Sequence, residues 1–373
     1  MPFRRQHFVP EVYLKSWESL VSSINEPKKK FRGLYYYDKH DLSMGDGRNK
    51  KSILYFPHTY TINFNLFPYF HRRAEIVSDF CKQLQEILDR RNVTVFLDNH
   101  PINDIRELLS LDVLTHIDNW AFVDRECGEI RSNTRTVNEI KDIRSYVLEH
   151  QIDKYLEKRW ESILTAFSSE IEIGLMQTSH AHEQIKVSQD VVCKLIDAML
   201  LMLCRNPVFD YIGIFPSVKE SYIKIISEYP HKEDEDSGIR RIMDEQMHAL
   251  WLNEIYKGLF SNEFGFLTSF SKAIKNSCRL ILFICPENNG SWLTSDNPAY
   301  IYYCNVTQTN RTGFYFPLSP KYLLAVGIGE PNSIDSIDVH ITNNEGVRYY
   351  NRITLSMANE AIISKEKYLG FIL

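Results

Sequence analysis

Long apolar runs are missing from this sequence. No stretch approaches the roughly 18 apolar residues that cross a bilayer, and the strongest candidate, Leu195–Cys204, is short and contains Asp197. The first seven residues, Met-Pro-Phe-Arg-Arg-Gln-His, contain no apolar core of a secretory signal. These absences predict a cytoplasmic protein that does not enter a membrane.

Paired cysteines are missing as well. The chain has seven cysteines, an odd number, and no two of them are spaced as C-x-x-C. Several lie within apolar stripes, as buried free thiols do. The pattern argues against a disulfide framework and against a zinc site made of thiolates, and it fits a reducing compartment.

Familiar nucleotide, metal and hydrolase motifs are also absent. The sequence contains no G-x-x-x-x-G-K, G-x-G-x-x-G, H-E-x-x-H or G-x-S-x-G segment. There is therefore no sequence motif for a nucleotide cofactor, and the need for a divalent metal is left open.

The charge of the chain is uneven. The net charge is −5, but residues 1–51 hold 11 basic and 6 acidic side chains, so the remainder is more acidic. The net negative charge disfavours electrostatic binding of nucleic acid by the protein surface as a whole. Two interpretations of the basic N-terminal residues remain: a local basic face that binds nucleotide or nucleic acid, or a loop whose charges are only solvated. These basic residues are Arg4, Arg5, Lys28, Lys29, Lys30, Arg32, Arg48, Lys50 and Lys51.

Three regions differ in pattern. Residues 1–70 form an N-terminal strand and loop segment with the basic face, and residues 71–276 carry apolar stripes at helical spacing. Residues 277–373 change to strand-like runs and end in a helix from near Asn343 toward Ala361. The expected strands there are Arg279–Cys285, Ala299–Tyr303, Phe314–Phe316, Tyr322–Ile328 and Ile337–Ile341.

This order of elements predicts an α+β fold. One mostly antiparallel sheet, built from the N- and C-terminal segments, would pack with a long all-helical middle region as one composite domain. A separate helical domain followed by a β-rich domain is the alternative.

The most informative polar cluster is Ser295-Asp296-Asn297-Pro298, which follows a strongly apolar run. Asp296 is a candidate base, metal ligand or partner of a basic residue, and Asn297 is a candidate catalytic neighbour. The alternative is structural, because Asp and Asn before proline build turns through side-chain-to-backbone bonds.

Three further residues are candidates for the same site. His7 precedes a helix that Pro10 would begin, which suits a general acid/base or a phosphate contact, or only a hydrogen bond to the chain start. Arg205 at the end of an apolar helix is a candidate clamp for an anion, or a cap for helix carbonyls. Asn351 is a candidate substrate ligand, or a satisfied core amide.

Taken together, these segments resemble an uncharacterised, mainly bacterial family, domain of unknown function 4238. Asn206 and Thr354 depart from the usual threonine and glutamine of that family. The segments that carry the resemblance are His7–Leu14 (H-x-x-P-x-x-Y-L), Arg205–Pro207 (R-x-P), Thr294–Pro298 (T-S-D-N-P), Pro317–Pro320 (P-L-S-P) and Asn351 with Ala358.

The resemblance implies no assigned activity, but it groups five polar residues, because all five lie in the motifs that carry it. They are His7, Arg205, Asp296, Asn297 and Asn351. One hypothesis is a hydrolase or nuclease-like enzyme acting on a phosphate-containing substrate, in defence against phage. His7, Asp296 and Asn297 would be catalytic there, and Arg205 and Asn351 would bind substrate. The other hypothesis is a non-catalytic binding or regulatory module whose polar motifs are a structural network.

Overall fold

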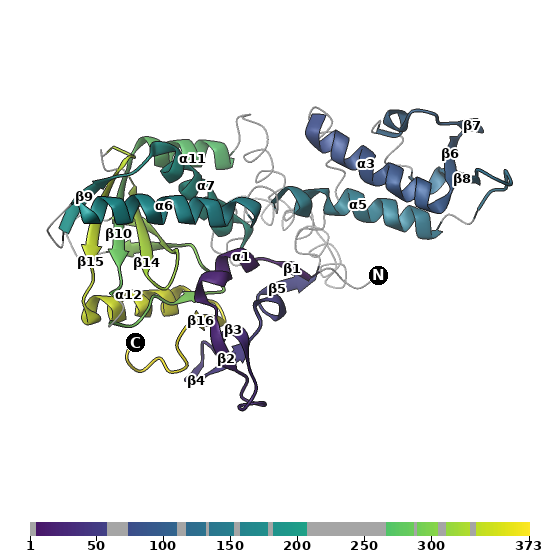
Figure 1. Ribbon diagram of the computed structural model, residues 1–373. Helices are drawn as coiled ribbons and strands as arrows, with labels where there is room; N and C mark the ends of the chain where they lie inside the picture. Colours follow the sequence, from purple (N-terminus) through teal and green to yellow (C-terminus); the bar gives the residue numbers. More distant parts are fainter. Residues whose placement is uncertain are drawn as a thin grey trace, which may run out of the picture. The chain divides into compact units, whose positions relative to one another are not determined.

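The computed structural model describes residues 5–57, 74–109, 117–131, 134–152, 157–177, 182–206, 266–286, 289–304, 311–328 and 333–373. These residues belong to two compact units that interleave along the sequence. The first unit draws on residues 1–59, 154–241 and 250–373, and the second on residues 60–153 and 242–249. Each unit has its own sheet or sheets and its own helices (Figure 1).

The largest element of the first unit is a six-stranded sheet. Neighbouring strands are antiparallel except for β10 and β15, which are parallel. The order across the sheet is β12 (Tyr300–Cys304), β13 (Arg311–Pro317), β14 (Tyr322–Ile328), β10 (Cys278–Ile284), β15 (Ser336–Ile341) and β9 (His182–Lys186). Along β10 buried and half-buried residues alternate, which is the period of a sheet with one fully covered face.

Three helices cover the buried face of this sheet: α6 (Lys158–Met176), α7 (Gln189–Arg205) and α11 (Phe266–Asn276). The ring of Phe270 on α11 lies 5.6 Å from that of Phe314, and Trp160 on α6 lies 5.7 Å from Phe316. Because Phe314 and Phe316 point to the same side of β13, both helices pack on that side. Figure 1 shows the three helices grouped together above the strands.

Helix α12 (Asn344–Met357) packs on one end of the other face. Its Tyr350 ring contacts Phe283 at 4.4 Å and Tyr315 at 5.8 Å, and both of those residues point away from α6 and α11. The helix begins where the sequence predicts, because the side chain of Asn343 accepts a hydrogen bond from the Gly346 N–H at 2.9 Å.

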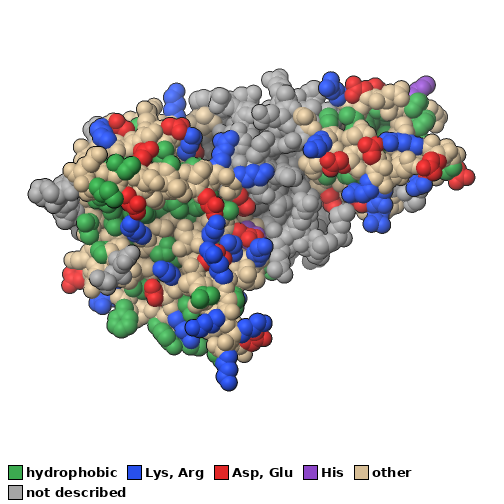
Figure 2. Space-filling view, viewed as in Figure 1, with side chains coloured by type: hydrophobic (Ala, Val, Ile, Leu, Met, Phe, Trp, Pro, Cys, Tyr) green, Lys and Arg blue, Asp and Glu red, His purple; other side chains and the backbone are tan. Residues whose placement is uncertain are grey.

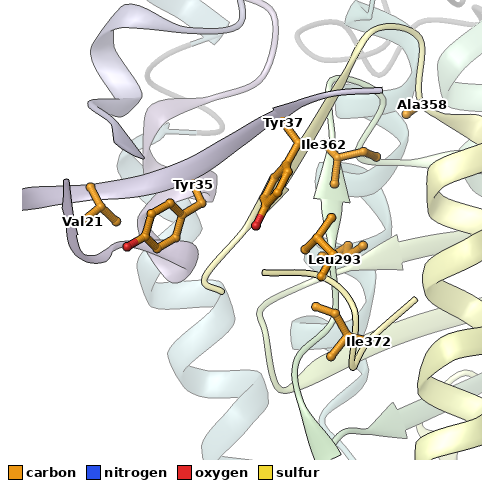
Figure 3. Packing of buried hydrophobic residues seen from close by; sticks show 8 residues of the cluster. Val21, Tyr35, Tyr37, Leu293, Ala358, Ile362 and Ile372 are labelled. Carbon is orange, nitrogen blue, oxygen red and sulfur yellow. The ribbon is translucent and has the colours of Figure 1, made fainter. Parts of the chain in front are cut away.

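A second sheet of the first unit combines both ends of the chain. Its order is β11 (Thr294–Ser295), β16 (Ala361–Ser364), β3 (Lys30–Asp38) and β2 (Ser19–Ser22), and β4 (Asp41–Arg48) also pairs with β3. An apolar cluster packs against it, and Figure 3 shows how its side chains from distant segments meet. Its buried members are Val21, Tyr35, Tyr37, Leu293, Ala358, Ile362, Leu369 and Ile372.

Short elements complete the N-terminal part. β1 (Arg5–His7) pairs with β5 (Tyr55–Pro57), and the other elements are α1 (Glu11–Leu14), η1 (Lys15–Trp17) and η2 (Lys50–Ser52). Pro10 directly precedes α1, so its missing N–H leaves no helix hydrogen bond unmade.

The second unit pairs two long helices with a small sheet. The helices are α3 (Ala74–Arg91) and α5 (Thr134–Ile152), and the sheet has the order β7 (His100–Pro101), β6 (Val93–Leu97) and β8 (Ala121–Asp124). The short turns η3 (Ile105–Leu109) and η4 (Ile117–Asn119) complete it. No helix in the described ranges combines the length and the apolar character that a membrane crossing requires.

The α+β class is confirmed, but two details of the predicted architecture were wrong. The strands of the two chain ends do not form a single sheet: β10 and β12–β15 assemble separately from β2–β4, and only β11 and β16 of the C-terminal segment join β2–β4. The middle region is not all-helical, since β6, β7, β8 and β9 lie within it. Asp98 and Asn99 both have positive φ, which is the turn geometry of a tight hairpin, and this local signal places β6 beside β7. The sequence boundaries at residues 70 and 276 stay a prediction.

Candidate functional site

Asp296 lies in the turn after β11 and points at the segment that enters β16. Its Oδ1 accepts a hydrogen bond from the Asn359 N–H at 2.9 Å. Its Oδ2 accepts from the N–H groups of Glu360 at 2.7 Å and Ala361 at 3.1 Å. The residue is 5% exposed. Both carboxylate oxygens therefore hold the backbone turn between α12 and β16.

Two opposing effects act on the pKa of the Asp296 carboxyl. Burial is the larger effect and raises the pKa above its ordinary value, while the three backbone N–H donors lower it. In the range between the ordinary and the raised pKa, the folded chain keeps a proton that the unfolded chain has lost. This titration therefore contributes stability at low pH that is lost as the pH rises through that range.

Asn206, from the Arg-Asn-Pro segment, reaches the same turn. Its side-chain amide donates to the backbone carbonyl of Asp296 at 2.5 Å, and the residue is 1% exposed. Asn206 follows the last residue of α7, so the end of this helix is tied to the motif turn. Arg205 ends the helix itself, and its side chain lies outside the described residues.

Asn297 closes the turn on the other side. Its side-chain amide donates to the carbonyl of Met357, the last residue of α12, at 2.9 Å. Within the turn, the Ser295 hydroxyl donates to the Asn297 carbonyl and accepts from the Asn297 N–H, both at 3.0 Å. This is the turn-forming use of Ser, Asp and Asn that the sequence left open.

Both the oxygen and the nitrogen of the Asn351 side chain form hydrogen bonds with backbone groups inside the protein. Its Oδ1 accepts from the Leu293 N–H at 2.9 Å, and its Nδ2 donates to the carbonyls of Ser291 at 3.1 Å and Ile372 at 2.9 Å. The residue is 1% exposed. It therefore joins α12 to the strand entry before β11 and to the C-terminal segment.

Tyr13 connects the six-stranded sheet and the second sheet of the first unit. Its hydroxyl donates to the carbonyl of Pro317 on β13 at 2.6 Å and lies 2.7 Å from the Thr294 hydroxyl on β11. Since the single phenolic proton goes to Pro317, Thr294 donates to Tyr13. In the sequence Tyr13 stands out only as part of the H-x-x-P-x-x-Y-L motif, although a buried tyrosine needs a partner for its hydroxyl. Tyr13, Asn206, Thr294, Asp296, Asn297 and Asn351 are called the motif network below.

His7 lies beside different residues. Its Nδ1 is 3.6 Å from Glu11 Oε1, and its ring lies edge-on to Tyr55 with centroids 5.7 Å apart. The hydrogen bonds of Asp296 go to the backbone of residues 359–361 and to Asn206. The structure thus brings Asn206, Asp296, Asn297 and Asn351 together, and it places His7 on the β1–β5 pair.

The expected basic face carries many internal ion pairs. Glu18 accepts from Arg32 at 3.3 Å and from Lys50 at 3.2 Å, and Asp46 pairs with Arg48 at 2.9 Å. Figure 2 shows basic side chains over the strands β2–β4 with acidic ones among them. These contacts reduce the charge available to a polyanion. Nucleic-acid binding by this face stays a prediction.

Within the described ranges, no group of three or more His, Cys, Asp or Glu side chains is placed to hold a metal ion. None of the six cysteines whose side chains the structure describes forms a disulfide. Burial raises the pKa of the Cys278 and Cys285 thiols to about 11, so both stay protonated and unreactive at neutral pH.

Two buried tyrosines predict a loss of stability in alkali. Burial raises the pKa of Tyr13 and Tyr300 well above the ordinary value, and the Tyr300 hydroxyl bonds Thr354 at 3.0 Å. Above about pH 10 the unfolded chain loses these protons and the folded chain keeps them. We expect the free energy of unfolding to fall by about 1.4 kcal/mol per pH unit for each tyrosine. Urea unfolding followed from about pH 9 to about pH 11 measures this slope.

Phenylalanine variants distinguish the contribution of these two tyrosines to the alkaline loss of stability from that of the other titrating groups. Tyr13→Phe with Tyr300→Phe lowers stability at neutral pH, but the alkaline decline becomes shallower because two protons no longer differ between the states. Parallel declines in the wild type and the double variant would show that other groups control the alkaline transition.

The fold and the motif network define an α+β protein in which side chains from α1, the residue after α7, α12 and the segment around β11 bind backbone groups of distant elements. Residues 5–368 match the model of a family described as protein of unknown function (DUF4238), and the chain belongs to that family. The resemblance read from the separated motifs is thereby confirmed. A search of curated proteins found no match, and neither did a search of solved structures.

Proposed function

We propose that this protein is a non-catalytic binding module whose motif network is structural. The observation that carries the proposal is the use of Asp296, whose two oxygens accept from three backbone N–H groups. A catalytic carboxylate must reach a proton or a metal ion of the reacting system. Asp296 would have to release the α12–β16 turn to do so.

The amides of the motif network support the same proposal. Asn206, Asn297 and Asn351 each donate to a backbone carbonyl from a segment far away in sequence. Side-chain amides that are bonded to the backbone of distant segments in this way help to specify a unique packing. Recognition of a partner is then left to other surfaces of the molecule.

A second candidate function is hydrolysis of a phosphate-containing substrate such as a nucleotide or nucleic acid, in a nuclease-like role against phage. The observation that favours it is the approach of His7 to Glu11, because a histidine beside a carboxylate is a common general base. In that account His7, Asp296 and Asn297 act in catalysis, while Arg205, Asn351 and the basic segment bind the substrate.

One experiment tests both candidates. The purified chain is incubated with ATP, GTP, single-stranded RNA and DNA in the presence of Mg²⁺, and phosphate release and strand cleavage are measured. We expect no turnover above that of the buffer. Turnover that His7→Ala abolishes in a folded protein would overturn the binding-module proposal. His40→Ala is the matched control, because His40 is exposed.

A further inference from the structure

Arginines gather in the second unit where α3 ends and α5 begins. Arg90 and Arg91 are the last two residues of α3, and Arg135 lies in the first turn of α5. Arg131 closes a hairpin that follows β8. Its N–H donates to the Phe122 carbonyl at 2.9 Å, and its guanidinium donates to the Arg91 carbonyl at 3.5 Å. The four arginine side chains are called the arginine cluster.

Three of these arginines surround one buried carboxylate. Arg90 Nη2 donates to Glu139 Oε2 at 2.9 Å, and Arg91 donates to both oxygens, through Nε at 3.3 Å and through Nη2. Arg135 Nε lies 3.7 Å from Glu139 Oε1, which is too long for a hydrogen bond. The Glu139 side chain is 6% exposed, whereas those of Arg90 and Arg135 are 63% and 79% exposed. Three positive charges therefore face one negative charge, and the positive charges lie nearer the surface.

Arg131 repeats this arrangement beside the other three. It pairs with Asp124, whose side chain is 1% exposed, while that of Arg131 is 55% exposed. Asp124 Oδ1 also accepts from the N–H groups of Glu126 at 2.7 Å and Cys127 at 3.1 Å, so this carboxylate shapes the hairpin. The exposed acids of the hairpin, Glu126 and Glu129, lie farther out, in its turn. Both buried carboxylates thus lie beneath the guanidinium groups that they position.

Helix stability does not account for Arg135. The start of a helix carries the positive end of the helix dipole, so a cation in the first turn is unfavourable. The first turn of α5 contains no acidic residue that would offset it. Glu139 already accepts three hydrogen bonds from Arg90 and Arg91, so this carboxylate does not need Arg135 either. A residue that breaks a local rule without stabilising the fold points to a functional role. A helix N-terminus and an exposed guanidinium both favour an anion.

We propose that the arginine cluster binds the phosphates of a nucleic-acid backbone, an inference that rests on the proposed binding function. Guanidinium groups bind phosphate oxygens through two parallel N–H donors, and the buried carboxylates hold them in fixed orientations. The four side chains come from two helices and a hairpin, so they fit several phosphates along one strand better than one small anion. Such contacts do not depend on the base sequence. The cluster belongs to the second unit, whereas the basic N-terminal residues belong to the first.

The test measures binding of labelled oligouridylate and oligodeoxythymidylate to the intact chain by fluorescence anisotropy, at several salt concentrations. Arg90→Ala combined with Arg135→Ala removes two phosphate-binding groups. Both residues are exposed and Arg91 stays paired with Glu139, so folding is kept. Arg106→Ala is the matched control, because Arg106 is an exposed arginine of the same unit. Thermal unfolding checks that both variants are folded.

We expect the wild type and Arg106→Ala to bind both oligonucleotides, with an affinity that falls as salt is added. In the double variant the affinity at low salt falls about tenfold or more. The slope of log affinity against log salt becomes shallower by about 1.4, which is about 0.7 for each of two lost phosphate contacts.

The proposal is overturned if neither oligonucleotide binds, if the double variant keeps the affinity and salt slope of the wild type, or if Arg106→Ala loses as much as the double variant. Complete displacement of the RNA by inorganic phosphate at about 1 mM would show a site for a small anion and would also overturn it. Absence of binding would leave the binding-module function standing with another partner. Cleavage of the bound strand would overturn that function and leave the arginine cluster standing.

Discussion

Asp296→Asn lowers the free energy of unfolding of the first unit by about 2–4 kcal/mol. The introduced amide can keep its oxygen toward Glu360 and Ala361, but its NH₂ group then faces the Asn359 N–H. One hydrogen bond is lost, and two donors oppose each other in a buried site. Asp296→Ala leaves all three N–H groups without an acceptor, and about 3–5 kcal/mol is expected. A whole domain is stable by only about 5–15 kcal/mol.

Tryptophan fluorescence during urea unfolding measures this loss, because Trp17, Trp160 and Trp292 of the first unit are fully buried. Asp190→Asn is the matched control: Asp190 is exposed on α7 and pairs with Lys194, so little change is expected. Equal urea midpoints for Asp296→Asn and the wild type would show that the carboxylate does not hold the α12–β16 turn. That result would favour the catalytic hypothesis.

Asn351→Asp destabilises by a comparable amount at neutral pH, about 3–5 kcal/mol. The new carboxylate oxygen replaces an NH₂ group that donates to the carbonyls of Ser291 and Ile372. Burial and the two carbonyls raise the pKa of the introduced carboxyl in the folded state. The folded chain therefore binds a proton that the unfolded chain releases above about pH 4. Stability is partly regained on lowering the pH, and it is lost as the pH rises.

The opposite pH dependence, or none, would contradict this account of Asn351. Asn344→Asp on the same helix is the control for the charge change. Asn344 is the exposed first residue of α12, where a carboxylate interacts favourably with the helix dipole, so its stability is unchanged or slightly raised. Urea unfolding of both variants at about pH 4 and about pH 7 makes the comparison.

Local patterns in the sequence were sufficient for part of the fold. The period-two run Arg279–Cys285 predicted β10, and Asn343 predicted the start of α12, because alternation and capping are properties of neighbouring residues. β16 was missed because Ala361–Ser364 is short and is stabilised by pairing with Tyr35–Asp38. β11 has only two residues, and its partner lies at the other end of the same C-terminal region.

The candidate site was predicted as a group of residues but not as a geometry. The resemblance grouped Asp296, Asn297 and Asn351, and each of the three binds backbone groups within one hydrogen-bonded region. Their partners are backbone N–H and carbonyl groups, which every residue carries, so no pattern of side chains reveals them. His7 was grouped with these residues by the resemblance alone, and in the structure its side chain lies beside that of Glu11.

The strand order of the second sheet has a consequence for synthesis on the ribosome. β3 is made within the first forty residues, yet one of its pairing partners, β16, is not made until residues 361–364. At about 5–20 residues per second, the edge of β3 stays unpaired for about 15–60 s while the rest of the chain is made. Tyr35 and Tyr37 of that strand, which are buried in the folded protein, would be exposed to other nascent chains during this time. The basic residues around β2–β4, which repel like-charged neighbours, would then act as protection against aggregation.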